Sequence, residues 1–323
     1  MIQRQKMTKA FVFPGQGSQA IGMGRLLADN FASARAVFAE VDEALQQKLS
    51  NIMWEGPEAD LTLTENAQPA LMSVSMAATR MLEAEHGITV ANTAKFVAGH
   101  SLGEYAALAA AGTFTIADAA RLLKIRGKAM QAATPVGTGA MAALLGLDFA
   151  TAAQVAAEAA QGDVCQAAND NSDGQVVISG SKAAVERACE IAKAKGAKRA
   201  IMLAVSAPFH CALMQPAADA MAEALANATM KSPVVPVIAN VVAGPLTDPD
   251  IIRQKLVEQV TGTVRWRECV SYMVANGVNV FVEIGAGKVL TGLAKKNAPD
   301  AQAFTAGTPD DIAVAAANLK QGS

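Results

Sequence analysis

Short apolar runs alternate along the chain with longer segments in which apolar side chains recur at helical spacing. The run at 10–13 precedes a mostly helical stretch from 25 to 49, and the run at 95–99 precedes an alanine-rich helical stretch. Residues 61–69 are predicted to be a loop that caps a helix over 70–85. Strands separated by helices indicate a parallel sheet, with ligands at the carboxyl ends of its strands.

The same alternation returns in the last third of the chain. The pattern there predicts helices at 213–228, 251–261, 266–275 and 288–296, and strands at 234–240 and 278–284. Gly285-Ala286-Gly287 follows the last of these strands but lacks the full dinucleotide-binding spacing, so we interpret it as a tight turn.

Between residues 139 and 205 the order of elements changes. The pattern predicts strands at 140–147, 164–168, 175–179 and 199–205, and helices at 149–160 and 182–195. This β-α-β-β-α-β order is typical of a ferredoxin-like unit. We therefore expect an α/β fold: a larger α/β-hydrolase-like domain with a parallel sheet (7–136 and 207–323), an inserted ferredoxin-like subdomain (137–206) and a disordered N-terminal extension (1–6).

Composition excludes several classes of protein. The chain has 323 residues and a net charge of −2, which argues against nucleic acid as its main partner. No apolar run approaches the roughly 20 residues of a membrane span, and the start lacks the apolar segment of a signal peptide. The four cysteines have no Cys-x-x-Cys spacing, which favours reduced thiols over a disulfide or metal site. We expect a cytoplasmic globular protein.

Gly99-His100-Ser101-Leu102-Gly103 lies between a predicted strand and a predicted helix, the context of a nucleophile elbow. A turn tight enough to project the Ser101 hydroxyl leaves no room for a Cβ on either side, which explains the two glycines. The following helix directs its free N–H groups to the same point, where they would stabilise a developing oxyanion. Ser101 is the candidate nucleophile; the alternative is an ordinary strand-to-helix turn.

A serine nucleophile usually needs a histidine base, and the chain has three histidines. His100 is next to Ser101 on an extended strand, so its side chain should point to the opposite face. His86 ends a predicted helix and fits a C-terminal cation. His210 remains as the candidate base, although a single histidine is often only structural.

Arg126 falls among apolar residues on the predicted helix 116–133, whereas Arg121, Lys124 and Lys128 share its polar face. A buried guanidinium is costly unless an anion meets it. The alternatives are an internal salt bridge, a snorkelling side chain, or a clamp for a substrate carboxylate.

Two further segments leave alternatives open. The glycines around Gln16 allow close backbone approach to a ligand, or form an ordinary loop. A basic cluster near a helix end either compensates the helix dipole or docks an acidic partner; it comprises Lys193, Lys195, Lys198 and Arg199.

Several motifs, in this order along the chain, resemble the malonyl-coenzyme A:acyl carrier protein transacylases and related acyltransferase domains. The matching segments are Phe13-Pro14-Gly15-Gln16-Gly17-Ser18-Gln19, the elbow continued to Tyr105, Arg126-Gly127-Lys128, Gln175 to Gly180, Phe209-His210 and Gly285 to Leu293. The resemblance runs nearly end to end.

This resemblance implies a specific site. Ser101 would be acylated, His210 would be its base, and the N–H groups of Gln16 and Leu102 would form the oxyanion hole. Arg126 would clamp the malonyl carboxylate, and a main-chain carbonyl near Gln259 would orient the histidine. Leu102 and Phe209 are similar to the malonyl pattern, whereas Ala207 and Pro208 depart from the signature of the large synthases.

The resemblance also implies the reaction. Malonyl would pass from malonyl-CoA to the phosphopantetheine thiol of acyl carrier protein in a ping-pong mechanism, with coenzyme A as a substrate and neither a cofactor nor a metal. Two alternatives stay open. One is a serine hydrolase or thioesterase that uses the same elbow, and the other is a non-catalytic scaffold that binds the carrier protein.

Overall fold

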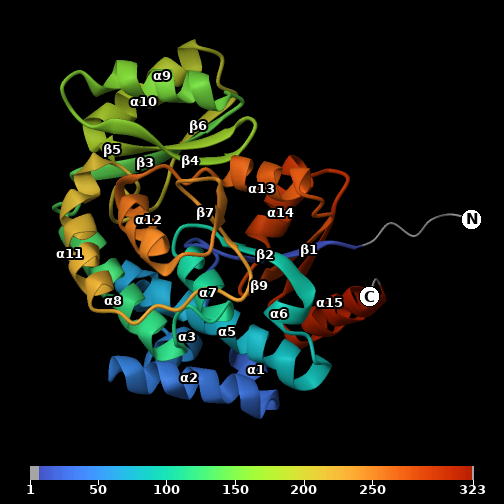
Figure 1. Ribbon diagram of the computed structural model, residues 1–323. Helices are drawn as coiled ribbons and strands as arrows, with labels where there is room; N and C mark the ends of the chain where they lie inside the picture. Colours follow the sequence, from blue (N-terminus) through green and yellow to red (C-terminus); the bar gives the residue numbers. More distant parts are fainter. Residues whose placement is uncertain (1–6, 322–323) are drawn as a thin grey trace, which may run out of the picture.

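The computed structural model describes residues 7–321, so the expected extension at 1–6 lies outside the described residues. Its strands form two sheets, one of six strands in the order β10-β9-β1-β2-β7-β8 and one of four in the order β4-β5-β3-β6 (Figure 1). The predicted α/β fold, with a larger parallel sheet and a smaller unit of the ferredoxin-like strand order, is confirmed.

The six-stranded sheet is parallel from β10 to β7, and only β8 runs antiparallel, beside β7. Its strands are β1 (Lys9–Phe13), β2 (Ala94–Gly99), β7 (Val237–Ala239), β8 (Gly244–Leu246), β9 (Val280–Ile284) and β10 (Gln302–Ala306). The sequence analysis made no prediction for β10 or for the helix that follows it.

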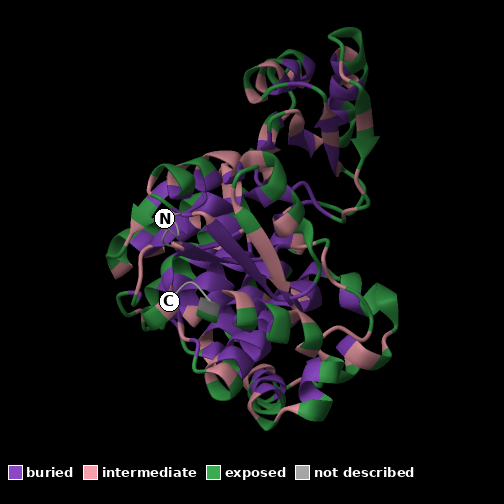
Figure 2. Cartoon of the chain, turned by 90° about the vertical axis from the view of Figure 1, so that its right-hand side faces the viewer, coloured by how far each residue is buried: buried purple, intermediate pink, exposed green. Residues whose placement is uncertain are grey.

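Side chains of β1 alternate between two apolar cores. Phe11 and Phe13 join the core that contains residues of α2 (Ala32–Leu45), α5 (Thr64–His86) and α8 (Ile116–Ala132). Ala10 and Val12 join the core of α13 (Trp266–Ala275) and α14 (Val289–Asn297). Figure 2 shows buried strands in the middle of this unit. Cover on both faces explains why these strands are continuous apolar runs rather than alternating ones.

The remaining helices connect or flank these layers. They are α1 (Arg25–Asn30), α3 (Leu49–Glu55), α4 (Glu58–Thr62), α6 (Val90–Thr93), α7 (Gly103–Ala110), the short 3-10 helix η1 (Ala212–Met214), α11 (Gln215–Ala226), α12 (Pro249–Thr261) and α15 (Pro309–Gln321). No helix within residues 7–321 is long and apolar enough to cross a membrane.

The four-stranded sheet contains β3 (Gly139–Leu145), β4 (Cys165–Ser172), β5 (Gln175–Ser181) and β6 (Arg199–Met202), with α9 (Phe149–Ala160) and α10 (Lys182–Ala194) between them. All its neighbouring strands are antiparallel, and it has an apolar core of its own. In Figure 1, α9 and α10 cover the side of this sheet that faces away from the larger sheet. The exact domain boundaries at 136/137 and 206/207 stay a prediction.

The predicted loop at 61–69 is wrong. The chain forms α4 up to Thr62 and then α5 from Thr64, with Pro69 inside the helix. A proline in the second turn removes a single backbone hydrogen bond, and the buried contacts of this helix outweigh that loss. The predicted strand at 199–205 is also too long, because β6 ends at Met202 and residues 203–205 leave the sheet to line a cavity beside Ser101.

Candidate active site

Ser101 lies in the turn between β2 and α7 with a left-handed φ of 54°. The turn requires both of its glycines. A Cβ on Gly99 would lie 1.9 Å from Gly103, and a Cβ on Gly103 would lie 2.2 Å from the carbonyl oxygen of Phe13. Strain of this kind is characteristic of functional turns, and here it presents the serine hydroxyl to the cavity.

His210 lies directly beside this hydroxyl. Its Nε2 is 2.7 Å from Ser101 Oγ, and its Nδ1 donates to the main-chain carbonyl of Gln259 at 2.9 Å. A carbonyl can only accept, so Nδ1 carries the proton and Nε2 is left to receive one. Burial, followed by the positive charge of Arg126, lowers the pKa of His210 to about 3. The imidazole is therefore neutral near pH 7, as a general base must be.

Neither of the other two histidines bonds the serine hydroxyl. His100 lines the same cavity, but its Nε2 lies 2.8 Å from Asn171 Oδ1. His86 is the last residue of α5, as its sequence position predicts.

Gln16 and Leu102 both lie near Ser101, since Gln16 lines the same cavity and Leu102 is the next residue in the chain. Gln16 follows β1 in a loop that lines the cavity, and Leu102 precedes the first turn of α7. Among the described residues, neither N–H donates a hydrogen bond to the protein. The Gln16 side chain accepts from Thr64 Oγ1 at 2.8 Å, which holds the loop to α5. Both donors are thus free for an oxyanion.

Arg126 extends from α8 to the serine and is only 1% exposed. Its Nη2 donates to Ser101 Oγ at 3.2 Å and to Gln259 Oε1 at 3.0 Å, and its Nη1 donates to Gln68 Oε1 at 2.8 Å. The internal salt bridge considered above is not formed, since no ion pair in the described part of the chain includes Arg126. Two neutral amides hold the guanidinium, and no carboxylate in the described part of the chain pairs with it directly; the buried carboxyl of Glu104 acts on it only at longer range.

Replacing Gln68 with glutamate should therefore neutralise the site. For the malonyl transfer that the sequence resemblance implies, we expect Gln68→Glu to lower kcat/KM roughly 10–100-fold, because a carboxylate beside Arg126 would compete with the carboxylate of the acyl group. Acetyl transfer should change less. Steady-state kinetics with both thioesters measure this, with Gln215→Glu on the surface of α11 as the control; equal losses for both acyl groups would contradict it.

Asn240, which was not predicted as a functional residue from the sequence, bonds the elbow on the side away from the cavity. Its Oδ1 accepts from the N–H of Ser101 at 2.8 Å, and its Nδ2 donates to the carbonyl of Gly99 at 2.7 Å. Its own N–H donates to Glu104 Oε2, which also accepts from the Gln259 side chain. Asn240 follows β7 directly, so the rule that functional groups gather at the carboxyl ends of parallel strands could have indicated it.

Glu104 is 1% exposed, and burial raises its pKa to about 7, against the opposing effects of its hydrogen bonds and of Arg126. Like Asn240, this buried glutamate was not predicted from the sequence to have a role. Its contacts place it behind the serine rather than in the cavity.

The cavity in front of Ser101 has a volume of about 310 Å³. Met141 of β3 and Asn169 of β4 line it from the smaller sheet, and Gln16, His100 and Ser101, which follow strands β1 and β2, line it from the larger one. A larger cavity of about 450 Å³ lies at the carboxyl ends of β9 and β10 and contains neither Ser101 nor His210. Among residues 7–321, no cluster of three or more His, Cys, Asp or Glu could hold a metal ion, and the four cysteines are buried and free.

Comparisons place these features among known proteins. A family model described as acyl transferase domain matches residues 10–309. The malonyl CoA-acyl carrier protein transacylase of Bacillus subtilis is 47% identical over 313 residues, which cover 97% of each chain. That of Escherichia coli strain K12 is 48% identical over 95% of this chain and 98% of its own length.

Solved structures with a similar fold carry the same kind of name. The acyl-carrier-protein-S-malonyltransferase from Bartonella henselae has a TM-score of 0.95 and 58% identity, covering 97% of this chain and 100% of its own. A malonyl-transacylase in complex with a type II PKS acyl-carrier protein has a TM-score of 0.93 and 43% identity, covering 96% and 99%.

Proposed function

Because the chain belongs to the acyl transferase domain family, we propose that it transfers the malonyl group of malonyl-CoA to the phosphopantetheine thiol of acyl carrier protein. The observation that carries this proposal is Arg126. A buried guanidinium with two neutral partners, within hydrogen-bond reach of the reactive hydroxyl, fits an acyl group that ends in a free carboxylate.

In the first half-reaction, His210 Nε2 takes the hydroxyl proton while Ser101 Oγ attacks the thioester carbonyl. The N–H groups of Gln16 and Leu102 stabilise the oxyanion of the tetrahedral intermediate. As the intermediate collapses, the carbon–sulfur bond breaks, the proton held by His210 passes to the coenzyme A thiolate, and malonyl-serine remains.

In the second half-reaction, His210 takes the proton of the carrier-protein thiol, and the thiolate attacks the ester carbonyl of malonyl-serine. The same oxyanion hole holds the second intermediate. Its collapse breaks the bond to Ser101 Oγ and returns the proton from His210 to the serine. The two half-reactions thus use one base and one oxyanion hole.

Phe209, in addition to Arg126, restricts which acyl groups the cavity accepts. Phe209 is mostly buried and lines the cavity just before His210, so its ring limits the width available to a branched acyl group. Coenzyme A enters as a substrate, and the mechanism requires neither a metal nor a prosthetic group. A cytoplasmic location remains a prediction.

Intact-protein mass spectrometry tests this function. The full chain is mixed with an equimolar set of malonyl-, methylmalonyl- and acetyl-CoA, without any acceptor thiol. We expect a stable gain of one malonyl group, mapped by digestion to the peptide that contains Ser101. Rapid release of free malonate would indicate a hydrolase instead, and absence of any adduct would indicate a scaffold.

The basic cluster at the end of α10 is our proposed docking surface for the carrier protein. Lys193 pairs with Glu190 and Lys195 with Glu158, whereas Lys198 and Arg199 form no ion pair within residues 7–321. We expect Lys198→Glu combined with Arg199→Glu to raise KM for the carrier protein about three- to ten-fold, with unchanged acylation by malonyl-CoA. Kinetics with Lys48→Glu and Lys231→Glu serve as the control, and an unchanged KM would place the dock elsewhere.

A further inference from the structure

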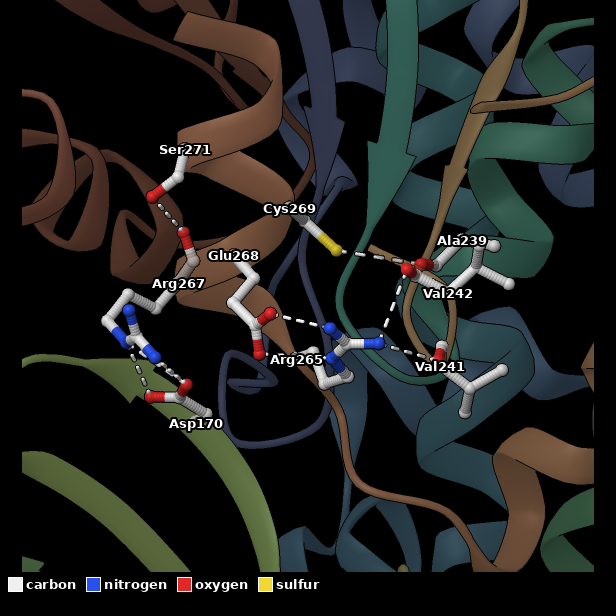
Figure 3. A network of polar contacts seen from close by, with 9 residues as sticks. All are labelled: Asp170, Ala239, Val241, Val242, Arg265, Arg267, Glu268, Cys269 and Ser271. Atoms are coloured by element: carbon white, nitrogen blue, oxygen red, sulfur yellow. Dashed lines mark hydrogen bonds and ion pairs between the residues drawn. The ribbon is translucent and has the colours of Figure 1, made fainter. Parts of the chain in front are cut away.

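The start of α13, that is its N-cap residue Arg265 and the first helical residues Trp266 and Arg267, lies between the two sheets. Figure 3 shows Arg265 directed to the turn after β7, and Arg267 directed to Asp170 on β4. None of these residues takes part in the mechanism above. Each nevertheless contacts a segment that carries an active-site residue.

Arg265 holds the segment behind the nucleophile. Its Nη1 donates to the carbonyls of Val241 and Val242 at 3.2 and 3.3 Å, and its main-chain N–H donates to the carbonyl of Asn240 at 3.1 Å. Glu268 binds the other side of the guanidinium at 2.5 and 3.0 Å (Figure 3). The turn is thereby fixed, and with it the Asn240 side chain that bonds the N–H of Ser101.

Arg267 holds the wall of the cavity. Its Nε lies 3.1 and 3.0 Å from the two carboxylate oxygens of Asp170, and its Nη2 lies 2.8 Å from Oδ2. Asp170 is only 1% exposed, so this pair fixes β4 firmly against α13. The neighbours of Asp170 face the site: Asn169 lines the cavity, and Asn171 bonds His100.

Trp266 contacts His100, whose side chain bonds Asn171 of β4. Its ring lies 5.7 Å from the ring of His100, centroid to centroid, and it is 1% exposed. His100 is thus held between Trp266 and Asn171, in the turn that joins the end of β2 to Ser101.

We propose that the first turn of α13 is a positioning element that sets two properties of the enzyme separately. Arg265, through Asn240, sets the reactivity of Ser101. Arg267, through Asp170, sets how well the thioester binds, because it holds the β4 wall of the cavity. The inference rests on the proposed malonyl transfer for its substrate but not for its geometry.

The backbone between β4 and α13 makes the test feasible. The N–H of Asp170 donates to the carbonyl of Val264, and the N–H of Val264 donates to the carbonyl of Ala168, at 2.9 and 2.8 Å. These main-chain bonds do not involve either arginine side chain, so they should remain in both variants. A variant should therefore loosen the wall or the turn without detaching the smaller sheet.

The experiment compares Arg265→Ala with Arg267→Ala in the full chain. A displacement of about 1 Å in a positioned group can cost up to ~10²-fold, so we expect a change of about ten-fold in one parameter for each variant. Arg267→Ala should raise KM for malonyl-CoA and leave kcat within about two-fold. Arg265→Ala should lower kcat and leave KM within about two-fold.

A second readout does not depend on malonyl transfer. The rate at which a small fluorophosphonate labels Ser101 should fall in Arg265→Ala and stay unchanged in Arg267→Ala. Arg267→Lys should restore most of the KM, since an ammonium can still pair with Asp170. Asp170→Asn with Arg267→Ala removes both charges and should keep the raised KM, even where the single variant folds poorly.

Arg187→Ala is the matched control, because Arg187 likewise joins two carbonyls and a carboxylate, on the side of the smaller sheet away from the cavity. It should change neither parameter. Equal effects of Arg265→Ala and Arg267→Ala on kcat and KM, or no effect of either, would overturn the inference. If the proposed function is wrong, the wild-type protein will form no malonyl adduct. The fluorophosphonate rates would still test the positioning role of Arg265 in that case.

Discussion

Arg126→Ala is expected to lower kcat/KM for malonyl transfer by ~10²–10⁴-fold, because the substrate carboxylate would then be buried without a cation. Acetyl transfer should fall little, since an acetyl group makes no ion pair. Initial rates with malonyl-CoA and acetyl-CoA, at the same carrier-protein concentration, give the selectivity ratio. That ratio should move strongly toward acetyl.

Two controls keep this result specific. Arg121→Ala removes an exposed arginine from the same helix, where it pairs with Asp118, and should leave both rates unchanged. Arg126→Lys keeps the charge but not the planar fork, so it should recover only part of the malonyl rate. If malonyl and acetyl transfer declined together in Arg126→Ala, the arginine would serve the serine rather than the carboxylate.

His210→Ala should slow acylation of Ser101 by ~10²–10⁴-fold, the usual contribution of a positioned general base. The 2.7 Å contact between Nε2 and the serine hydroxyl, with Nδ1 bound to the Gln259 carbonyl, is the geometry behind this expectation. Single-turnover mixing with malonyl-CoA measures the step without carrier protein. A rate near that of the wild type would exclude His210 from the mechanism.

The pH dependence of the same step follows from the low pKa of His210. A base acts only when unprotonated, so the rate falls as the pH drops through its pKa. An ordinary histidine would halve the rate near pH ~6.5. Because the pKa of His210 is about 3, its titration should leave acylation undiminished from pH ~8 to ~5.

Glu104 is a second group that could change the rate within this pH range, and its titration can be separated from that of His210. Burial raises the pKa of its carboxyl to about 7, so any change of rate near neutral pH should come from this group. Glu104→Gln should remove that change and leave the remaining profile flat. A fall centred near pH ~6.5 that persists in Glu104→Gln would show that His210 titrates normally.

Local sterics and periodicity were enough to predict several features of this protein. The glycines at positions 99 and 103 predict the nucleophile elbow, because a side chain at either position would collide with nearby backbone. Arg126 could be identified from helical spacing, since the position of a residue on a helix decides which side it faces. The ferredoxin-like order of strands was likewise visible, because its elements are short and punctuated by turns.

The partners of these residues depend on packing between distant segments. Ser101 and Asn240 are 139 positions apart, and Arg267 and Asp170 are 97 apart. No local pattern encodes such pairings. The first forms when β2 and β7 become neighbours in the larger sheet, and the second forms when β4 packs against α13. The helix through Pro69 has the same origin, since buried contacts outweighed a local signal to stop. Short sequence motifs thus identify the reactive residues, whereas the orientation of their side chains depends on contacts that form only in the folded chain.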